Sequence, residues 1–213
     1  MRSKISTTDQ DRRSFIEQAR RGQIIECAIQ AIAELGYAEV SLAKIARRAQ
    51  ISTGVISYYF AGKEDLIREV MTHVYATGDA FVRPRVEGKA PARDALLAFI
   101  EASVGFVAAY PQYLTAMVEI IASRRAARVV SPQDQAMGDI RRDALTRILQ
   151  SGQASGEFRA FRVSVMTDVI IEAIDLAAIR DVEPGPFAKD LVDLFDHATR
   201  APAEAAPGIT GAA

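Results

Sequence analysis

Apolar positions recur along most of this chain at the three- and four-residue spacing of helices. The first stripe runs from about Phe15 to Leu35, and Gly36 stands where a helix commonly ends in the left-handed conformation. Another begins near Lys63, with acidic residues in its first turn, and continues to about Pro84. The pattern predicts an all-α protein of about nine helices. Residues 1 to about 13 lack this periodicity and are predicted to form a mobile polar arm.

The stretch from Ser41 to Leu66 predicts two short helices joined by a tight turn. Ser41 and Ser52 can each accept a hydrogen bond from a free amide in the first turn of a helix. An apolar residue precedes each serine, and a second one follows at the spacing that lets the two pack together. These pairs are Val40 with Ile45 and Ile51 with Ile56. The stretch therefore predicts a DNA-binding helix-turn-helix.

The second of these helices has a predictable outer face, because each residue advances about 100° around the axis. Ile56 and Phe60 fall together on the inner side, which places Tyr58 on the outer side. Thr53 lies at the amino end, the end that enters the major groove in such units. A plain helical hairpin with its tyrosines in the core is the competing interpretation. The outward aromatic and a cluster of cations argue against it, namely Lys44, Arg47, Arg48 and Lys63.

Charge is distributed unevenly along the 213 residues, although the formal net charge is only −1. Up to Lys63 the chain has 10 Lys and Arg against 6 Asp and Glu, whereas the remainder has 16 against 21. A basic head on an acidic body suits nucleic-acid binding by the head. A solvated basic surface is the alternative.

The first third of the chain resembles the tetracycline-repressor (TetR) family of bacterial transcription regulators. The resemblance is carried by these residues: Gly36-Tyr37, Ser41, Lys44-Ile45-Ala46, Ala49, Ile51 to Ile56, Tyr58-Tyr59-Phe60 and Lys63 to Leu66. It implies a DNA-binding head, a divergent helical body that binds a small-molecule effector, and a homodimer on a palindromic operator. The predicted DNA-binding set consists of family contact positions and the two capping serines: Ser41, Ala43, Lys44, Ser52, Thr53, Gly54, Val55, Ser57, Tyr58, Tyr59 and Lys63.

Two positions depart from the usual family pattern. Gln50 stands where glycine is usual in the turn, so a non-glycine residue has to make it. Ser57 stands where many members have tyrosine, which resembles the branch that includes the choline-responsive betaine-pathway regulators. The chain has no tryptophan, so an aromatic cage for choline would rely on Tyr and Phe. The branch resemblance is therefore not extended to choline itself.

The body, predicted as residues 64–200 after a head of residues 1–63, contains further helical segments. They are expected at Ala92 to Ala109, from Pro111, from Ser131-Pro132 to about Gln150, at Ser164 to Asp181, and from Pro184 onward. The glycines of residues 151–158 predict a loop. Residues 201–213, rich in Ala, Pro and Gly, are predicted to be a disordered tail.

The segment Ser164 to Asp181 is apolar on much of its circumference, which indicates burial on two sides. The resemblance implies that the last two helices pair with their counterparts in a four-helix bundle. Coverage within one chain is the alternative. The predicted dimer residues are Met166, Ile170, Ile174, Leu191, Leu194 and Phe195.

The sequence gives little support for catalysis or for metal binding. His73 and His197 are the only histidines, and neither stands in a metal-ligand pair or a nucleophile-base arrangement. No cofactor is predicted. Without an apolar signal segment or a long apolar run, the expectation is a cytoplasmic, non-enzymatic protein.

Effector binding is implied by the family resemblance and by polar residues embedded in apolar body helices. Taken singly, each candidate is more often a core or interface residue. The candidates are Phe106, Tyr110, Tyr113, Met117, Glu119, Arg124, Met137, Arg141, Glu172 and Asp175. The chain is thus predicted to be a ligand-released repressor. The alternatives are a helical small-molecule-binding protein and a nucleoid-type DNA binder without operator specificity.

Overall fold

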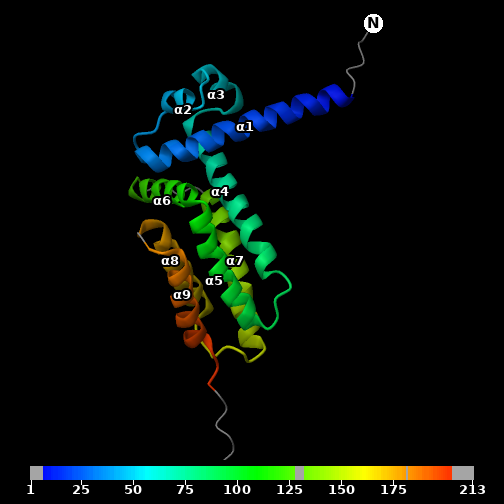
Figure 1. The fold of residues 1–213 in the computed structure, drawn as a ribbon, viewed down its shortest axis with the longest axis vertical. Coiled ribbons are helices and arrows are strands. Elements are labelled where there is room, and N and C mark those ends of the chain that lie inside the picture. Colours follow the sequence, from blue (N-terminus) through cyan, green and yellow to red (C-terminus); the bar gives the residue numbers. More distant parts are fainter. Residues whose placement is uncertain (1–6, 128–131, 181, 203–213) are drawn as a thin grey trace, which may run out of the picture. The chain divides into compact units, whose positions relative to one another are not determined.

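The computed structural model describes residues 7–127, 132–180 and 182–202 (Figure 1). Within these ranges the chain forms nine α-helices and no strand beyond one isolated bridge between Phe158 and Arg200. The predicted all-α class with a helix-turn-helix at the amino end is confirmed. The proposed cap at Ser131 and the tail beyond residue 202 lie outside the described residues.

The nine helices follow the predicted order, with boundaries close to those expected from periodicity. They are α1 Thr7–Leu35, α2 Leu42–Arg48, α3 Thr53–Tyr59, α4 Lys63–Val86, α5 Ala92–Ala109, α6 Pro111–Ala126, α7 Pro132–Ala154, α8 Val163–Ile179 and α9 Pro184–Thr199.

Helix α1 begins at Thr7, so the prediction of a non-helical arm up to residue 13 was wrong for residues 7–13. Apolar periodicity could not identify this segment because residues 7–13 include no apolar residue. Even at Phe15 and Ile16 the side chains are 72% and 55% exposed. The segment contains Gln and Arg, which are good helix formers, and extending an existing helix costs far less than nucleating one.

Helix α7 continues to Ala154, through the region where two glycines predicted a loop. A Cβ atom built at Gly152 would lie 2.1 Å from the ring of Phe158. Gly152 therefore permits close packing within the fold, and it does not mark a turn. Gly156, at φ +80, makes the turn that follows the helix.

The chain forms two compact units by internal contacts. Unit 1 runs to Ala80 and includes Val107–Asp139, while unit 2 combines Phe81–Phe106 with the chain from Ile140. The predicted division into residues 1–63, 64–200 and 201–213 stays a prediction.

In unit 1, α1 contacts both α2 and α6, and α2 contacts α3 (Figure 1). Fully buried isoleucines come from each of the first three helices, namely Ile24, Ile29, Ile32, Ile45 and Ile56. Their burial, with the contacts between α1 and α2 and between α2 and α3, fixes the orientation of the two short helices, which are too short to be stable alone.

In unit 2, the core is formed by side chains from α5, α7, α8 and α9. Leu96 and Ile100 of α5 meet Leu145 and Leu149 of α7. Four residues predicted for the dimer interface belong to the same core: Ile170, Ile174, Leu191 and Phe195.

Two carboxylates connect the beginning of α5 to distant parts of unit 2. Arg93 donates to the buried Asp196 of α9 at 2.9 Å, and Arg200 also donates to Asp196. Glu157 accepts from the backbone amides of Ala92 and Arg93 at 3.2 and 3.0 Å. The hydrogen bond from Arg93 lowers the pKa of Asp196, and the backbone hydrogen bond from Arg93 lowers the pKa of Glu157. Both carboxylates thus stabilise this end of unit 2 in their charged form.

Candidate nucleic-acid interface

Both predicted helix caps of the helix-turn-helix are present. The Ser41 hydroxyl accepts from the amide of Lys44 at 3.3 Å, and the Ser52 hydroxyl accepts from the amide of Val55 at 3.4 Å. Each cap satisfies one of the amides that the first turn of a helix leaves without an intrahelical partner. The start of α3 is therefore fixed by its own sequence.

The turn between α2 and α3 is made by Gln50, at φ +56. Its amide donates to the carbonyl of Arg47, and the amide of Ile51 donates to the carbonyl of Ala46 at 3.0 Å. Gln50 thus adopts the left-handed conformation at a position where the family usually has glycine, as the sequence predicted. That conformation costs roughly 1 kcal/mol for a residue with a side chain.

Helix α3 presents a small, polar outer face. Ile56 and Phe60 are buried, whereas Tyr58 is 74% exposed. The ring of Tyr58 meets that of Tyr59 edge to face, with centroids 4.9 Å apart. The other exposed positions of the predicted DNA-binding set are Ser41, Ala43, Ser52, Thr53, Gly54 and Ser57, while Lys44, Val55, Tyr59 and Lys63 are half-buried.

Most cations near α3 are held by other groups of unit 1. Lys44 donates to the carbonyl of Glu39 at 2.6 Å, and Arg48 pairs with Glu34. Lys63 donates to the carbonyl of Tyr37 at 3.1 Å and lies 4.5 Å above the centre of that ring. These contacts orient the charged groups on the surface.

Arg47 differs from its neighbours because it is exposed and forms no ion pair or side-chain hydrogen bond with any described residue. It is absent from the predicted DNA-binding set, although the basic cluster in the sequence includes it. Its position in the last turn of α2 leaves its charge free for an external anion.

A polar chain of contacts joins α6 to the start of α4 in unit 1. The Tyr37 hydroxyl donates to Glu64 at 2.8 Å, and Arg124 of α6 pairs with the other oxygen of Glu64 at 3.4 Å. Burial, and then the hydrogen bond to Glu64, raise the pKa of Tyr37. Arg124, a predicted effector residue, therefore contacts the segment that follows α3.

A second polar cluster involves α1, α4 and α6. His73 lies 3.0 Å from a carboxylate oxygen of Glu26, and the Tyr113 hydroxyl donates to the same oxygen. Burial, followed by that hydrogen bond, raises the pKa of Tyr113. The ring of Tyr110 lies 5.2 Å from that of Tyr113.

The ten predicted effector residues are distributed over both units. Met117 is buried in unit 1, and an exposed Glu119 places an oxygen 3.3 Å from where Gly36 would carry a Cβ atom. In unit 2, Arg141 pairs with Asp175 at 2.7 Å, Glu172 is exposed, and the buried Phe106 lies 5.8 Å from Phe81. The side chain of Met137 lies outside the described residues. The effector assignment stays a prediction.

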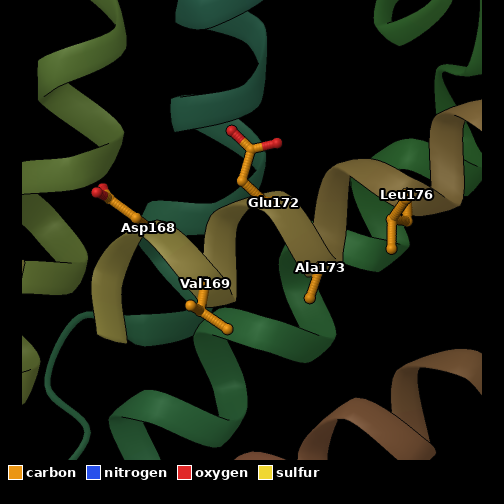
Figure 2. Close-up of a pocket in the computed structure, with 5 residues that line it drawn as sticks. All are labelled: Asp168, Val169, Glu172, Ala173 and Leu176. Carbon is orange, nitrogen blue, oxygen red and sulfur yellow. The ribbon is translucent and has the colours of Figure 1, made fainter. Parts of the chain in front are cut away.

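The outer side of α8 exposes several aliphatic side chains together with two carboxylates. Figure 2 shows Asp168, Val169, Glu172, Ala173 and Leu176 around a shallow concavity, all on successive turns of this helix. Val165 and Val169 are each 50% exposed on α8, and Leu194 of α9 is 57% exposed. Of the predicted dimer residues, Leu194 is thus at the surface and Met166 is half-buried. Ile170, Ile174, Leu191 and Phe195 face the core of the same chain.

None of the helices in the described part of the chain is long and apolar enough to cross a membrane. The same residues contain no group of three or more His, Cys, Asp or Glu side chains arranged to hold a metal ion.

The capped pair α2 and α3, seated on α1, defines a helix-turn-helix domain of the class that binds DNA. Residues 24–70 match the model of the family described as bacterial regulatory proteins, tetR family. This match covers the end of α1, the helix-turn-helix and the first turns of α4.

Curated relatives align with the same region. The chain is 36% identical over 87 residues to the HTH-type transcriptional regulator BetI 1 of Chromohalobacter salexigens, covering 40% of this chain and 43% of that protein. It is 37% identical over 89 residues to BetI of Paraburkholderia phytofirmans, covering 41% and 46%. The alignment thus spans less than half the length of these relatives.

Solved structures resemble the fold over most of the chain. A tetR-family regulatory protein from Rhodococcus RHA1 has a TM-score of 0.74 at 20% identity, covering 86% of this chain and 98% of the other. FadR from Bacillus subtilis, solved in complex with stearoyl-CoA, has a TM-score of 0.71 at 23% identity, covering 81% and 95%. Residues 24–70 thus match the DNA-binding region of this family, and the chain shares its fold with these solved structures.

Proposed function

We propose that this protein is a DNA-binding transcriptional regulator, a repressor that a small-molecule effector releases from its operator. The observation that carries the proposal is the outer face of α3, where Tyr58 is 74% exposed beside small polar residues. A helix with this surface can enter the major groove and bring Thr53, Val55 and Tyr58 to the edges of the bases. Its capped amino end supports that orientation.

Affinity for the DNA backbone would come from the cations around α3. Lys63 is held in place by Tyr37, and Arg47 is free of partners among the described residues. Each phosphate contact releases condensed counterions, so the affinity should fall as the salt concentration rises. Base contacts by α3 would add sequence selectivity to this salt-dependent affinity.

Two copies of the chain would bind one operator. The exposed apolar side chains on the outer side of α8 and α9 support a symmetric four-helix interface, because such a surface loses contact with water on pairing. The residues proposed for it are Val165, Val169, Leu176 and Leu194, with Met166 beside them. Two α3 helices about 34–36 Å apart would then occupy successive major grooves of a pseudo-palindromic site.

The effector would act by binding better to a dimer whose two heads no longer match this spacing. A shift from 1:99 to 99:1 between the two states requires an affinity difference of about 10⁴-fold. The contact between Arg124 and Glu64 supports α6 as part of this response, because it joins α6 to the residue after Lys63.

A gel-shift titration tests the proposal on DNA from upstream of this protein's own gene. The expected result is a salt-sensitive shift that specific DNA competes away and bulk DNA does not, with much weaker binding by Tyr58→Ala and Lys63→Ala. Equal competition by bulk DNA would instead indicate a nucleoid-type binder. No shift at any salt concentration, with both variants behaving like wild type, would leave only small-molecule binding.

A further inference from the structure

We propose that Arg21, on α1, is a positioning residue that holds the carboxyl end of α3 in the orientation needed to read DNA. This inference rests on the proposed function, since reading DNA is what the positioning serves. Arg21 lies outside the predicted DNA-binding set and outside the residues matched by the family model, which begin at Ile24.

Helix α3 contains no group of its own that stabilises its carboxyl end. It has only seven residues, and its amino end is capped by its own Ser52. Its last turn contains no basic residue, whereas that of α2 contains Arg47 and Arg48. The last carbonyls of a helix lack intrahelical donors and carry the negative end of the helix dipole, so a cation there is stabilising.

Arg21 supplies this cation from another helix. Its Nη1 atom donates to the carbonyl oxygen of Tyr59, the last residue of α3, at 2.9 Å. The guanidinium carbon lies 4.6 Å from the ring centre of Phe60, the buried residue at which α3 ends. One planar group thus contacts both the last carbonyl and the side chain that anchors the helix end.

The guanidinium is itself fixed by α4. Its Nη2 atom pairs with Glu69 at 2.9 Å, and both side chains are about one-third exposed. A flexible surface arginine would lose much conformational freedom on binding a single carbonyl. With Glu69 on one side and Phe60 on the other, Arg21 joins α1, α3 and α4 at one point.

Tyr58, which is proposed to contact the bases, lies next to the residues that Arg21 holds. Tyr58 precedes Tyr59 and touches its ring edge to face. Loss of the guanidinium frees the last turn of α3, and with it the direction of the exposed Tyr58 ring. The Ser52 cap at the other end of the helix would remain.

The neighbouring Arg20 is a matched control. It is exposed, and its only described hydrogen bond goes to Gln23 on the same helix at 2.8 Å. Arg20→Ala and Arg21→Ala therefore remove the same charge from adjacent positions of α1. Only the second removes contacts with α3.

The experiment measures binding by fluorescence anisotropy, over a range of salt concentrations, to a labelled fragment from upstream of this protein's own gene. Losing a hydrogen bond from a charged donor predicts about tenfold weaker binding for Arg21→Ala, with an unchanged salt slope because no phosphate contact is lost. Arg20→Ala should bind within about threefold of wild type, since it disturbs only an exposed contact. Arg21→Lys and Glu69→Gln should fall between wild type and Arg21→Ala.

Two results would overturn the proposal. One is equal binding by Arg21→Ala and Arg20→Ala. The other is a salt slope for Arg21→Ala smaller by about one, which indicates a direct phosphate contact.

Hydrogen exchange of the free protein separates this proposal from the proposed function. The Phe60 amide, which donates to Ile56 at the end of α3, should exchange faster in Arg21→Ala and not in Arg20→Ala. If wild-type protein shows no selective DNA binding, the proposed function fails. Faster exchange then still demonstrates that Arg21 holds the helix end, and unchanged exchange shows that it does not.

Discussion

Helices α3 and α8 both present side chains to solvent, but of opposite character. The outer face of α3 is small and polar around one aromatic ring, whereas that of α8 carries the exposed aliphatic side chains of Val165, Val169 and Leu176 beside two carboxylates. A polar face can exchange water for phosphates and base edges at little cost. An aliphatic face gains only from contact with another apolar surface. This difference supports the proposed roles of α3 in binding DNA and of α8 in pairing with a second copy of the chain.

The largest expected effect comes from charging the α8 face with the double substitution Val169→Glu and Leu176→Glu. Two carboxylates per chain cannot be buried against a partner, so the dimer should dissociate. Operator affinity should then fall by about 100-fold or more, because the two heads no longer bind together. Sedimentation equilibrium and anisotropy titration measure the two effects.

Ile140→Glu is the matched control for this change, because Ile140 is 55% exposed on α7. It should leave both mass and affinity unchanged. A double variant that stays dimeric would show that the α8 face is not the interface.

The next effect concerns the ion pair that joins α9 to the beginning of α5. Asp196→Asn removes the charge shared by Arg93 and Arg200, and weakening these charged hydrogen bonds predicts a decrease of about 2 kcal/mol in the free energy of unfolding at pH 7. Urea unfolding measures it. Asp193→Asn, at an exposed position of the same helix, should change stability little.

The carboxylate of Asp196 also makes the free energy of unfolding depend on pH. The pKa of Asp196 is lowered in the folded protein, so its stabilisation is complete above the ordinary carboxylate pKa, about 4. It is lost as the pH falls through the lower folded value. Glu157 adds to this loss with the same sign. Asp196→Asn should therefore flatten the acid side of a stability profile, and an unchanged profile would contradict this role.

Tyr58→Ala tests the polar face of α3. The ring is mostly exposed, so stability and dimer mass should not change, whereas operator affinity should fall about 30-fold through lost base contacts. Phe15→Ala removes a ring that is 72% exposed on α1 and should leave affinity unchanged. Equal losses for the two variants would show that exposed aromatic area, and not the face of α3, determines binding.

Arg47→Ala should have a smaller effect on the same interface. Losing one phosphate contact predicts about threefold weaker binding and a salt slope smaller by about one. Stability should not change, because Arg47 has no ion pair or side-chain hydrogen bond among the described residues. An unchanged slope would place Arg47 away from the DNA backbone.

Gln50→Gly should have the smallest effect. Relief of the left-handed conformation is partly offset by the greater freedom of glycine in the unfolded chain, so the expected gain in stability is about 0.5 kcal/mol. DNA affinity should stay the same. A loss of affinity would indicate that the Gln50 side chain itself contacts DNA.

The helix-turn-helix could be predicted from the sequence because its signals are local. Ser41 and Ser52 cap the helices that follow them within three residues, and the outward direction of Tyr58 follows from helical periodicity. Local hydrogen bonds and periodicity do not depend on which distant segments the helix meets. The resemblance to the tetR family rests on these same residues.

Only the tertiary structure decided which apolar residues of α8 and α9 face inward. Ile170 and Ile174 entered the core of unit 2 while Val165 and Val169 stayed at the surface, a choice the sequence left open because the helix is apolar on both sides. The close approach of Arg21 to the end of α3 likewise depends on two residues that are 38 positions apart and belong to different helices. The sequence by itself determined where the helices of the head begin and which way α3 faces. The fold determined which side of each body helix is covered and which cation holds the end of α3, because both depend on long-range packing.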